Sequence, residues 1–380
     1  MRRNNTSPRS NWQSKVEASG LVYHSPREAP NRPYWDESCY YEFTAAEIDM
    51  LEATGNRLQQ KYLAAAQHVI DEKMYERLAI PPQAVPLIEW AWESEPPSLY
   101  GRFDLIYDGQ SPPKLLEYNA DTPTSLLEAS VVQWSWLEEC FPQADQFNSL
   151  HEHLMAKWKD VAPFLSKPVY FTCMEDAEDW ITTNYLRETA EQAGVQTQLI
   201  QIADIGWNEG TQSFVDLDDK TIFSIFKLYP WEMLLRDDFA PHLLQVYREM
   251  KWIEPIWKLL LSNKGMLPLV WEMYPDDDNL LPAYDDSPRA MNEFVRKPFF
   301  SREGQNIALH AKELTLETPG TYADGRVVYQ QLAKSAIFDG HYPVLGLWMI
   351  DQECCGLGIR ESAAPITDNF SSFVPHLFRS

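Results

Sequence analysis

Cysteine is scarce in this chain, which has five cysteines among 380 residues. They are Cys39, Cys140, Cys173, Cys354 and Cys355, an odd number without C-x-x-C spacing. This pattern argues against a disulfide framework and against a zinc knuckle, and it favours a reducing compartment. The chain also begins without the apolar segment of a secretory signal, so we expect a cytoplasmic protein.

Long apolar runs and excess positive charge are missing as well. No run approaches the ~20 apolar residues that span a bilayer. The 32 Lys and Arg against 56 Asp and Glu give a net charge of −24. Because nucleic-acid affinity comes mainly from cations that neutralise phosphates, we expect neither a membrane nor a nucleic acid as partner. An acidic field favours a cationic ligand such as a polyamine, although solubility alone also explains the charge.

Two common nucleotide-binding motifs are absent. The chain contains neither G-x-x-x-x-G-K-[ST] nor G-x-G-x-x-G, so Walker and Rossmann chemistry have no support. The 44% hydrophobic content is nevertheless that of an ordinary globular protein with a large core. Any nucleotide chemistry must therefore come from another arrangement of residues.

The polar and apolar pattern divides the chain into four parts and indicates a mixed α/β (α+β) protein. Residues 1–33 are polar and predict a loosely ordered arm. Residues 34–167 hold scaffold helices and a hairpin, and one helix opens at the capping box Thr44–Glu47. Residues 168–262 alternate strand-like and helix-like runs, which predicts a small α/β domain with a parallel sheet. Residues 263–380 predict mainly antiparallel strands.

A β-hairpin is predicted for residues 102–107 and 114–119, because polar and apolar residues alternate in both runs around a turn-rich segment. Symmetric closure places Asp104 opposite Glu117, on a polar face that also carries Asn119. Two opposed carboxylates repel each other unless a cation lies between them. Carboxylate and amide oxygens suit a hard divalent ion, so the pattern predicts a magnesium site.

The alternative for this hairpin is a solvated polar face. In that case Arg102 and Lys114 neutralise the two carboxylates and no metal is needed. Under either interpretation the opposite face is expected to meet the core, and it carries Phe103, Leu105, Leu116 and Tyr118.

Two lysines are candidate phosphate ligands. Lys297 lies between Val295 and Phe299 on the face of a strand that is otherwise apolar, and Lys264 precedes a helix-like run. The glycine-ended turn Ser301–Gly304 lies shortly after Lys297 in the sequence, and its backbone amides can cover phosphates. Taken singly, each lysine also fits a surface residue whose ammonium group reaches water. Together with the acidic hairpin, they indicate nucleotide binding.

Several ordered strings resemble the synthetase domain of glutathionylspermidine synthetases, and more closely the stand-alone bacterial members described as acid–amine ligases. The strings are Gly101–Asp104, Leu116–Thr122, Lys227–Glu232, and Lys297-Pro298 with Ser301–Gly304. The resemblance, which runs from about Tyr34 to the carboxyl end, implies an ATP-grasp fold in the permuted order of glutathione synthetases. Residues 34–167 and 263–380 then form the ATP-grasp parts, and residues 168–262 form the substrate domain.

The resemblance also implies roles for individual residues. Asp104, Glu117 and Asn119 match ligands of magnesium, with two Mg²⁺ ions expected, and Arg102 and Arg360 match active-site arginines. The positions that match ATP contacts are Lys264, Lys297, Glu303, Gly304, Gln330, Gln331, Leu332, Ala333, Ile366 and Thr367. The positions that match contacts to the acid substrate are Arg102, Thr122, Glu178 and Asp179.

The activity implied is that of an ADP-forming ligase, which joins an acid to an amine through an acyl phosphate. A peptide-like acid such as glutathione and a polyamine such as spermidine are the implied substrates. Thr122, Asp179 and Leu228 stand where the spermidine-conjugating enzyme has serine, glutamate and threonine, so both substrates stay open, as does the oligomeric state. The alternatives are an inactive ATP-grasp scaffold or regulator, and a metal-dependent hydrolase, which has no need of the lysines.

Overall fold

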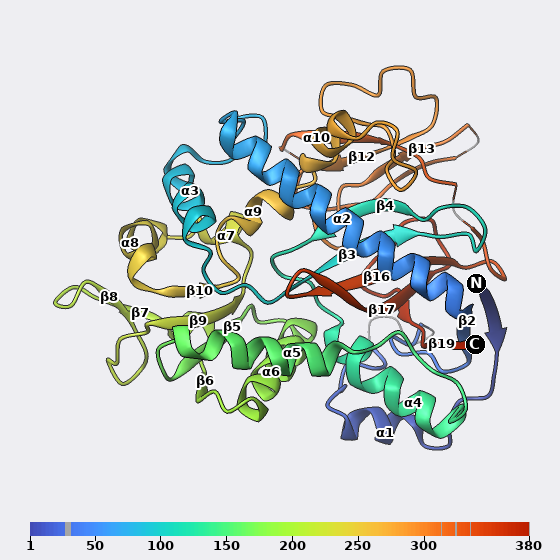
Figure 1. Cartoon of the computed structure of the whole chain (residues 1–380), viewed down its shortest axis with the longest axis horizontal. Helices are drawn as coiled ribbons and strands as arrows, with labels where there is room; N and C mark the ends of the chain where they lie inside the picture. The colour runs from blue at the N-terminus through green and yellow to red at the C-terminus, as the bar shows by residue number, and fades with distance from the viewer. Residues whose placement is uncertain (27–31, 313, 324, 335, 380) are drawn as a thin grey trace.

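The structure is a computed structural model that describes residues 1–26, 32–312, 314–323, 325–334 and 336–379. It is a mixed α/β protein in which helices cover several separate sheets (Figure 1). Among the described residues, no helix combines the length and the apolar content that crossing a membrane requires.

A five-stranded antiparallel sheet occupies the middle of the molecule, and the predicted hairpin forms one of its edges. Its strand order is β18-β17-β16-β3-β4. The strands are β3 (Tyr100–Ile106), β4 (Lys114–Asn119), β16 (Tyr342–Ile350), β17 (Glu353–Ser362) and β18 (Ser372–Phe373). Segments more than 200 residues apart in the sequence therefore pair directly, because β3 lies beside β16.

The hairpin has the predicted register only at its open end. Arg102 pairs with Asn119 and Asp104 with Glu117, as the alternation predicted, but a β-bulge then shifts the pairing so that Leu105 meets Leu115. Leu115 is consequently fully buried, whereas Leu116 is only half-buried. The prediction that Leu116 belongs to the core face was wrong, because the bulge inserts one extra residue and reverses the faces beyond it.

A second five-stranded antiparallel sheet has the order β11-β15-β12-β13-β14. Its strands are β11 (Ala283–Tyr284), β12 (Phe294–Pro298), β13 (Ala308–His310), β14 (Thr315–Glu317) and β15 (Val327–Gln331). Antiparallel pairing in this region agrees with the sequence prediction. Lys297 lies on β12, opposite Val328 of β15.

A third sheet is parallel, with the order β10-β9-β5-β6. Its strands are β5 (Val169–Cys173), β6 (Thr197–Leu199), β9 (Ser224–Leu228) and β10 (Lys251–Ile253), and a hairpin of β7 (Gly206–Asn208) and β8 (Ser213–Val215) lies in the same part of the sequence. The boundaries proposed at residues 167/168 and 262/263 stay predictions.

The amino-terminal residues form regular structure, so the predicted loose arm was wrong for the part that is described. A small sheet of β1 (Arg2–Asn5), β2 (Cys39–Thr44) and β19 (His376–Arg379) brings the two ends of the chain together (Figure 1). Helix α1 (Trp12–Ala18) follows, and it buries Val16. Residues 27–31 of the predicted arm lie outside the described residues.

Helices cover the faces of these sheets. The long helix α2 begins at the predicted capping box, where Thr44 and Glu47 bond reciprocally, and it crosses β16 and β17 (Figure 1). Helices α5 and α6 pack together beside β5. The helices are α2 (Ala45–Asp71), α3 (Val85–Ser94), α4 (Gln133–Cys140), α5 (Leu150–Val161), α6 (Ala177–Gln192), α7 (Trp231–Leu234), α8 (Ala240–Val246), α9 (Lys258–Leu261) and α10 (Met266–Met273).

The segment after β4 begins without helical structure, although Thr122-Pro123 has the pattern of an N-cap followed by proline at the first helical position. Residues 122–125 are not helical, and helical backbone begins at Leu126. It continues through a π-helical turn, Glu128–Val132, into α4. The non-helical stretch matters because Thr122, Thr124 and Ser125 line the cavity described next.

Candidate functional site

A cavity of about 250 Å³ is lined by strands of both antiparallel sheets, by the segment after β4 and by the start of α6. Every residue to which the sequence analysis gave a site role lines it. These residues are Arg102, Asp104, Glu117, Asn119, Thr122, Glu178, Asp179, Lys264, Lys297, Glu303, Gly304, Gln330, Gln331, Leu332, Ala333, Arg360, Ile366 and Thr367. The structure brings them together, and the role of each stays a prediction.

The two hairpin carboxylates are accompanied by cations of the protein itself. Arg102 donates from Nε and Nη2 to the two oxygens of Asp104, at 2.6 and 3.0 Å. Lys264 Nζ lies 3.3 Å from Glu117 Oε2. Cations of the protein therefore relieve the repulsion between Asp104 and Glu117. This agrees in part with the alternative of a solvated face, in which Arg102 was one of the two neutralising cations. Lys114, however, donates to the Asp278 carbonyl instead.

Glu117 and Lys297 influence each other's ionisation. Burial opposes the charge of Glu117, but Lys264 and Lys297 outweigh that effect and lower its pKa. Burial lowers the pKa of Lys297 to about 8, and the attraction of Glu117 opposes this shift. The Lys297 ammonium donates to the Leu116 carbonyl at 3.1 Å and to Gln330 Oε1 at 2.9 Å. These contacts place a buried positive charge beside an ionised carboxylate.

The donor set of the hairpin fits a magnesium ion. Asp104 and Glu117 are cross-strand partners, and Asn119 follows on the same face of β4 as Glu117. All three side chains offer oxygen, which is the donor that Mg²⁺ prefers, and they leave coordination positions for phosphate. The Asn119 side-chain oxygen accepts a bond from the Thr122 amide at 3.3 Å, which orients it toward the segment after β4.

The predicted phosphate-covering turn lies against a distant loop. Glu303 and Gly304 both have positive φ, 55° and 70°. A Cβ at Gly304 would lie 2.3 Å from the carbonyl oxygen of Thr367, so only glycine fits here. Lys264 Nζ donates to the Ser301 carbonyl at 2.5 Å. The turn therefore contacts Lys264, a predicted phosphate ligand, on one side and Thr367, a predicted ATP contact, on the other.

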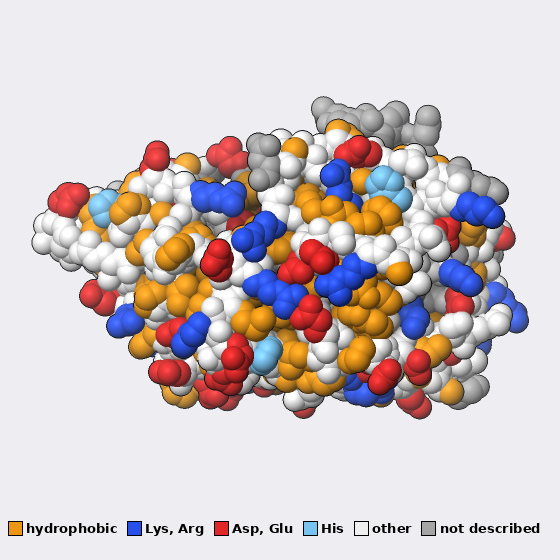
Figure 2. All heavy atoms as spheres, turned by 90° about the horizontal axis from the view of Figure 1, so that it is seen from above, with side chains coloured by type: hydrophobic (Ala, Val, Ile, Leu, Met, Phe, Trp, Pro, Cys, Tyr) orange, Lys and Arg blue, Asp and Glu red, His pale blue; other side chains and the backbone are white. Residues whose placement is uncertain are grey.

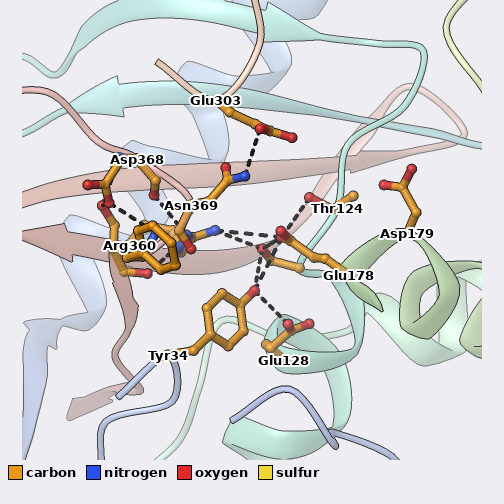
Figure 3. Close-up of polar contacts among 12 residues, drawn as sticks. Tyr34, Thr124, Glu128, Glu178, Asp179, Glu303, Arg360, Asp368 and Asn369 are labelled. Carbon is orange, nitrogen blue, oxygen red and sulfur yellow. Dashed lines mark hydrogen bonds and ion pairs between the residues drawn. The ribbon is translucent and has the colours of Figure 1, made fainter. Parts of the chain in front are cut away.

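Arg360 and Glu178 form the centre of a second polar network (Figure 3). Oε1 of Glu178 accepts from the hydroxyls of Thr124 at 2.7 Å and Ser125 at 2.9 Å, and Arg360 Nη1 lies 3.7 Å from it. Arg360 also donates to main-chain carbonyls and lies 4.9 Å above the ring of Tyr34. Its guanidinium is thus held from several sides at the cavity wall.

Some residues that line the cavity had no role predicted from the sequence. Arg302 donates to Thr122 Oγ1 at 2.5 Å and so bridges the turn to the segment after β4. Burial raises the pKa of Asp179 to about 7, against the opposing charge of Arg302. Burial likewise raises the pKa of Glu232, and the positive charge of Arg302 opposes this shift. Arg302 and Glu232 lie in two of the strings on which the family resemblance rests. The resemblance therefore pointed to both residues, although no role was predicted for either.

One departure from the family pattern lies away from the cavity. Leu228 is fully buried at the end of β9 and is not among the described residues that line the cavity. The neighbouring Lys227 forms a buried ion pair with Asp121 at 2.6 Å, and Asp121 also accepts from the Trp231 amide. This pair ties the segment after β4 to the parallel sheet.

Comparisons with known proteins agree with these features. A family model described as glutathionylspermidine synthase preATP-grasp matches residues 3–379. A Haemophilus influenzae protein named "Putative acid--amine ligase" is 40% identical over an alignment of 374 residues, which covers 94% of this chain and 94% of its own. Trypanothione synthetase of Crithidia fasciculata is 28% identical over 94% of this chain and 58% of its own.

Two further proteins extend the comparison. The bifunctional glutathionylspermidine synthetase/amidase of Escherichia coli is 27% identical over 86% of this chain and 55% of its own length. This chain thus matches little more than half of that relative and of the trypanothione synthetase. The solved structure of a glutathione synthetase-like effector from Globodera pallida superposes with a TM-score of 0.60 over 97% of this chain and 96% of that one, at 10% identity. That likeness concerns the fold alone.

Proposed function

Because the chain belongs to the glutathionylspermidine synthase family, we propose that it is an ATP-dependent acid–amine ligase. The observation that carries the proposal is the meeting of two unlike groups in one cavity. The acidic hairpin of β3 and β4 faces the buried Lys297 of β12 and Lys264, which precedes α10. A nucleoside triphosphate with its divalent cation needs both: oxygen ligands for the cation and positive charges for the phosphates.

The proposed reaction begins with the acid. Its carboxylate is a poor acyl donor because oxygen leaves badly, so the carboxylate attacks the γ-phosphate of ATP and gives an acyl phosphate and ADP. The amine then attacks the acyl carbon, phosphate leaves and an amide remains. The work of the protein is mainly positioning and charge stabilisation, as in other phosphoryl transfers.

Charge explains the residue types in this cavity. ATP and the acid are both anionic, and they must approach each other within bonding distance. Lys264, Lys297 and Arg102 all line the cavity, and in this proposal the two lysines meet phosphate oxygens and the arginine meets the acid. Asp104, Glu117 and Asn119 would hold Mg²⁺, which when bound neutralises charge on the phosphates. Charged groups of both signs also lie side by side on the outer face seen in Figure 2.

The substrates that we propose are small molecules. The names of the relatives indicate a peptide-like acid such as glutathione and a polyamine such as spermidine. The acidic side chains of Glu178, Asp179 and Glu232 at the cavity suit a substrate that carries an ammonium group. A nucleotide-binding scaffold without ligase activity is the second candidate, since the cations that pair with Asp104 and Glu117 relieve their repulsion without any metal.

The test is formation of ADP with MgATP, glutathione and spermidine, first together and then with each substrate omitted. A panel of other acids and amines follows, with mass detection of the conjugate. A ligase makes conjugate and ADP in equal amounts, and it turns over repeatedly only when both substrates are present. A scaffold binds MgATP in calorimetry and makes no ADP with any pair. A metal-dependent hydrolase cleaves its substrate without ATP, and such ATP-independent cleavage would overturn the proposal.

A further inference from the structure

A short chain of hydrogen bonds leads from the cavity to a buried carboxyl group (Figure 3). Ser125 lines the cavity, and its Oγ lies 3.0 Å from the hydroxyl oxygen of Tyr34. The Tyr34 hydroxyl donates to Glu128 Oε1 at 2.7 Å. Tyr34 and Glu128 are 0% and 1% exposed and lie behind the cavity wall, outside its lining.

Unusual backbone marks both ends of this chain of bonds. Ser125 has a φ of 69°, a conformation that costs free energy for any residue with a Cβ. Glu128 begins the π-helical turn, a form that is rare and often occurs at functional sites. Two such departures within four residues are consistent with a constraint from function, because a regular helix from Thr122 would avoid both.

Glu128 is suited to accept a proton. Its Oε2 is buried and has no hydrogen-bond partner among the described residues. Burial and the charge of Glu178 raise the pKa of Glu128 to about 7, while Tyr34 and Arg360 lower it. The carboxyl group can therefore exist in either protonation state near neutral pH.

The Ser125 hydroxyl donates to Glu178 Oε1 at 2.9 Å, and a rotation of this hydroxyl aims its proton at the Tyr34 oxygen, 3.0 Å away. Oε1 of Glu178 already accepts from Thr124 Oγ1 at 2.7 Å and lies 3.7 Å from Arg360. The Ser125 proton can therefore point to Tyr34 without leaving that oxygen unpaired. In this orientation one lone pair of Ser125 Oγ accepts from Arg360 Nη1 at 3.2 Å, and the second lone pair is left for a donor in the cavity.

Amide formation requires such an acceptor. An amine is bound mostly as its ammonium ion near neutral pH, and only the neutral form attacks an acyl carbon. The nitrogen must also lose a proton after the attack. A buried proton acceptor that is connected to the cavity is the arrangement that general base catalysis uses.

We propose that Ser125, Tyr34 and Glu128 relay a proton away from the attacking amine, an inference that rests on the proposed ligase function. The N–H bond of the amine breaks and its proton binds Ser125 Oγ. The Ser125 proton moves to Tyr34, and the Tyr34 proton moves to Glu128 Oε1. The net change is one N–H bond broken and one carboxyl O–H bond formed, so no other reactant is needed.

The first experiment measures conjugate formation by the Glu128→Gln and Tyr34→Phe variants. The probes are MgATP, glutathione and spermidine, or the acid and amine that the panel identifies. We expect kcat for amide formation to fall about 100-fold in each variant, with the KM for ATP unchanged. The single burst of ADP from ATP and acid alone needs no base and is expected to stay at the wild-type level.

Hydroxylamine distinguishes a relay from a merely structural role. This nucleophile is already neutral near pH 7, so the loss in both variants is expected to be much smaller than with spermidine. The wild-type rate with spermidine is expected to fall as the pH drops below about 7, because Glu128 must be ionised to accept a proton, and Glu128→Gln removes this dependence. Glu138→Gln, the same change at an exposed position of α4, is the matched control.

An infrared titration tests the acceptor without any substrate. A carboxyl C=O band that disappears as the pH rises through about 7 is expected in the wild type. Glu128→Gln is expected to lose the part of this band that belongs to Glu128 and to keep the part that belongs to Asp179, whose pKa burial also raises to about 7. The relay is overturned if Glu128→Gln leaves this band unchanged, if both variants ligate spermidine at the wild-type rate, or if hydroxylamine shows the same loss as spermidine. A wild-type chain that ligates no pair overturns the proposed function, and the infrared band then decides on Glu128 separately.

Discussion

Glu117 is the residue on which the metal prediction depends most. It faces Asp104 across the hairpin, and Lys264 and Lys297 lower its pKa at a partly buried position. We expect Glu117→Gln to weaken MgATP binding by roughly 100-fold, because the amide keeps the shape and loses the charge. Isothermal calorimetry with MgATP, and with ATP in the presence of chelator, measures the change.

The control for this variant is Glu138→Gln, on the exposed face of α4, which makes the same substitution at a residue that does not line the cavity. Thermal unfolding shows whether each variant is folded. Unchanged MgATP affinity in a folded Glu117→Gln protein contradicts the metal assignment. It favours the alternative in which protein cations alone neutralise the hairpin.

Part of this site could be predicted from local sequence alone. Alternation of polar and apolar residues gives the pairing of Asp104 with Glu117, because side chains alternate between faces along each strand. The bulge beyond it was not predictable, since Leu115 and Leu116 are both apolar and either can face the core. The contact of Arg302 with Thr122 joins residues 180 positions apart, and no local pattern predicts it.

At the scale of elements, the turn after β12 depends on one glycine. A Cβ on Gly304 meets the Thr367 carbonyl at 2.3 Å, so Gly304→Ala must move the turn away from the 366–367 loop. We expect a folded protein with at least about tenfold weaker ATP binding, equal to ~1.4 kcal/mol. Fluorescence titration with a nucleotide analogue and competition by ATP measures this.

Gly340→Ala separates crowding from backbone strain. Gly340 also has positive φ, 82°, but a Cβ there meets nothing within 4 Å. It therefore shares the conformational cost of Gly304→Ala without the steric contact. If both variants bind ATP equally well, contact between the turn and the 366–367 loop is not needed for nucleotide binding.

Strand β1 supports the strand that carries Arg360. Arg3 donates from Nε and Nη2 to the two oxygens of Glu361, at 3.1 and 2.8 Å, and both side chains are mostly buried. We expect Arg3→Ala to lower the free energy of unfolding by about 3 kcal/mol, because Glu361 is left buried without its cation. Urea unfolding followed by tryptophan fluorescence measures the loss.

The control for this prediction is Arg2→Ala, an exposed position on the same strand. Equal stability losses in the two variants contradict a specific role of the Arg3–Glu361 pair. Asp36, Cys39 and Glu361 also bring three possible metal-ligating atoms within 4.8 Å of one another. Since Arg3 donates to both Cys39 and Glu361, a cation of the protein already occupies that cluster.

The amino-terminal elements show why composition misled the sequence analysis. The first 33 residues are polar, yet Val16 and Leu21 are fully buried, and the partner of Arg3 lies 358 positions away. A polar segment that pairs with the far end of the chain has no local signal of burial. In contrast, the capping box of α2 is a local motif, and the structure confirms it.

On the scale of the whole molecule, two buried groups make stability depend on pH in opposite directions. Burial lowers the pKa of His376 to about 3. Its Nε2 accepts from the Phe147 amide and Nδ1 lies 2.9 Å from Gln133 Oε1, so the neutral ring is the form that the fold holds. Between pH 6.5 and about 3 only the unfolded chain binds this proton, so His376 lowers stability as the pH falls.

Glu128 acts in the opposite sense, because its pKa is raised from 4.5 to about 7 in the folded state. Between these values the folded protein holds a proton that the unfolded chain releases, so stability falls as the pH rises. We expect Glu128→Gln to gain stability over the wild type from about pH 5 to pH 7, by up to ~1.4 kcal/mol per pH unit. His376→Gln is expected to show the reverse slope, with its gain growing toward low pH. Urea unfolding at several pH values measures both slopes, and a difference from the wild type that does not change with pH contradicts the assignment for that residue.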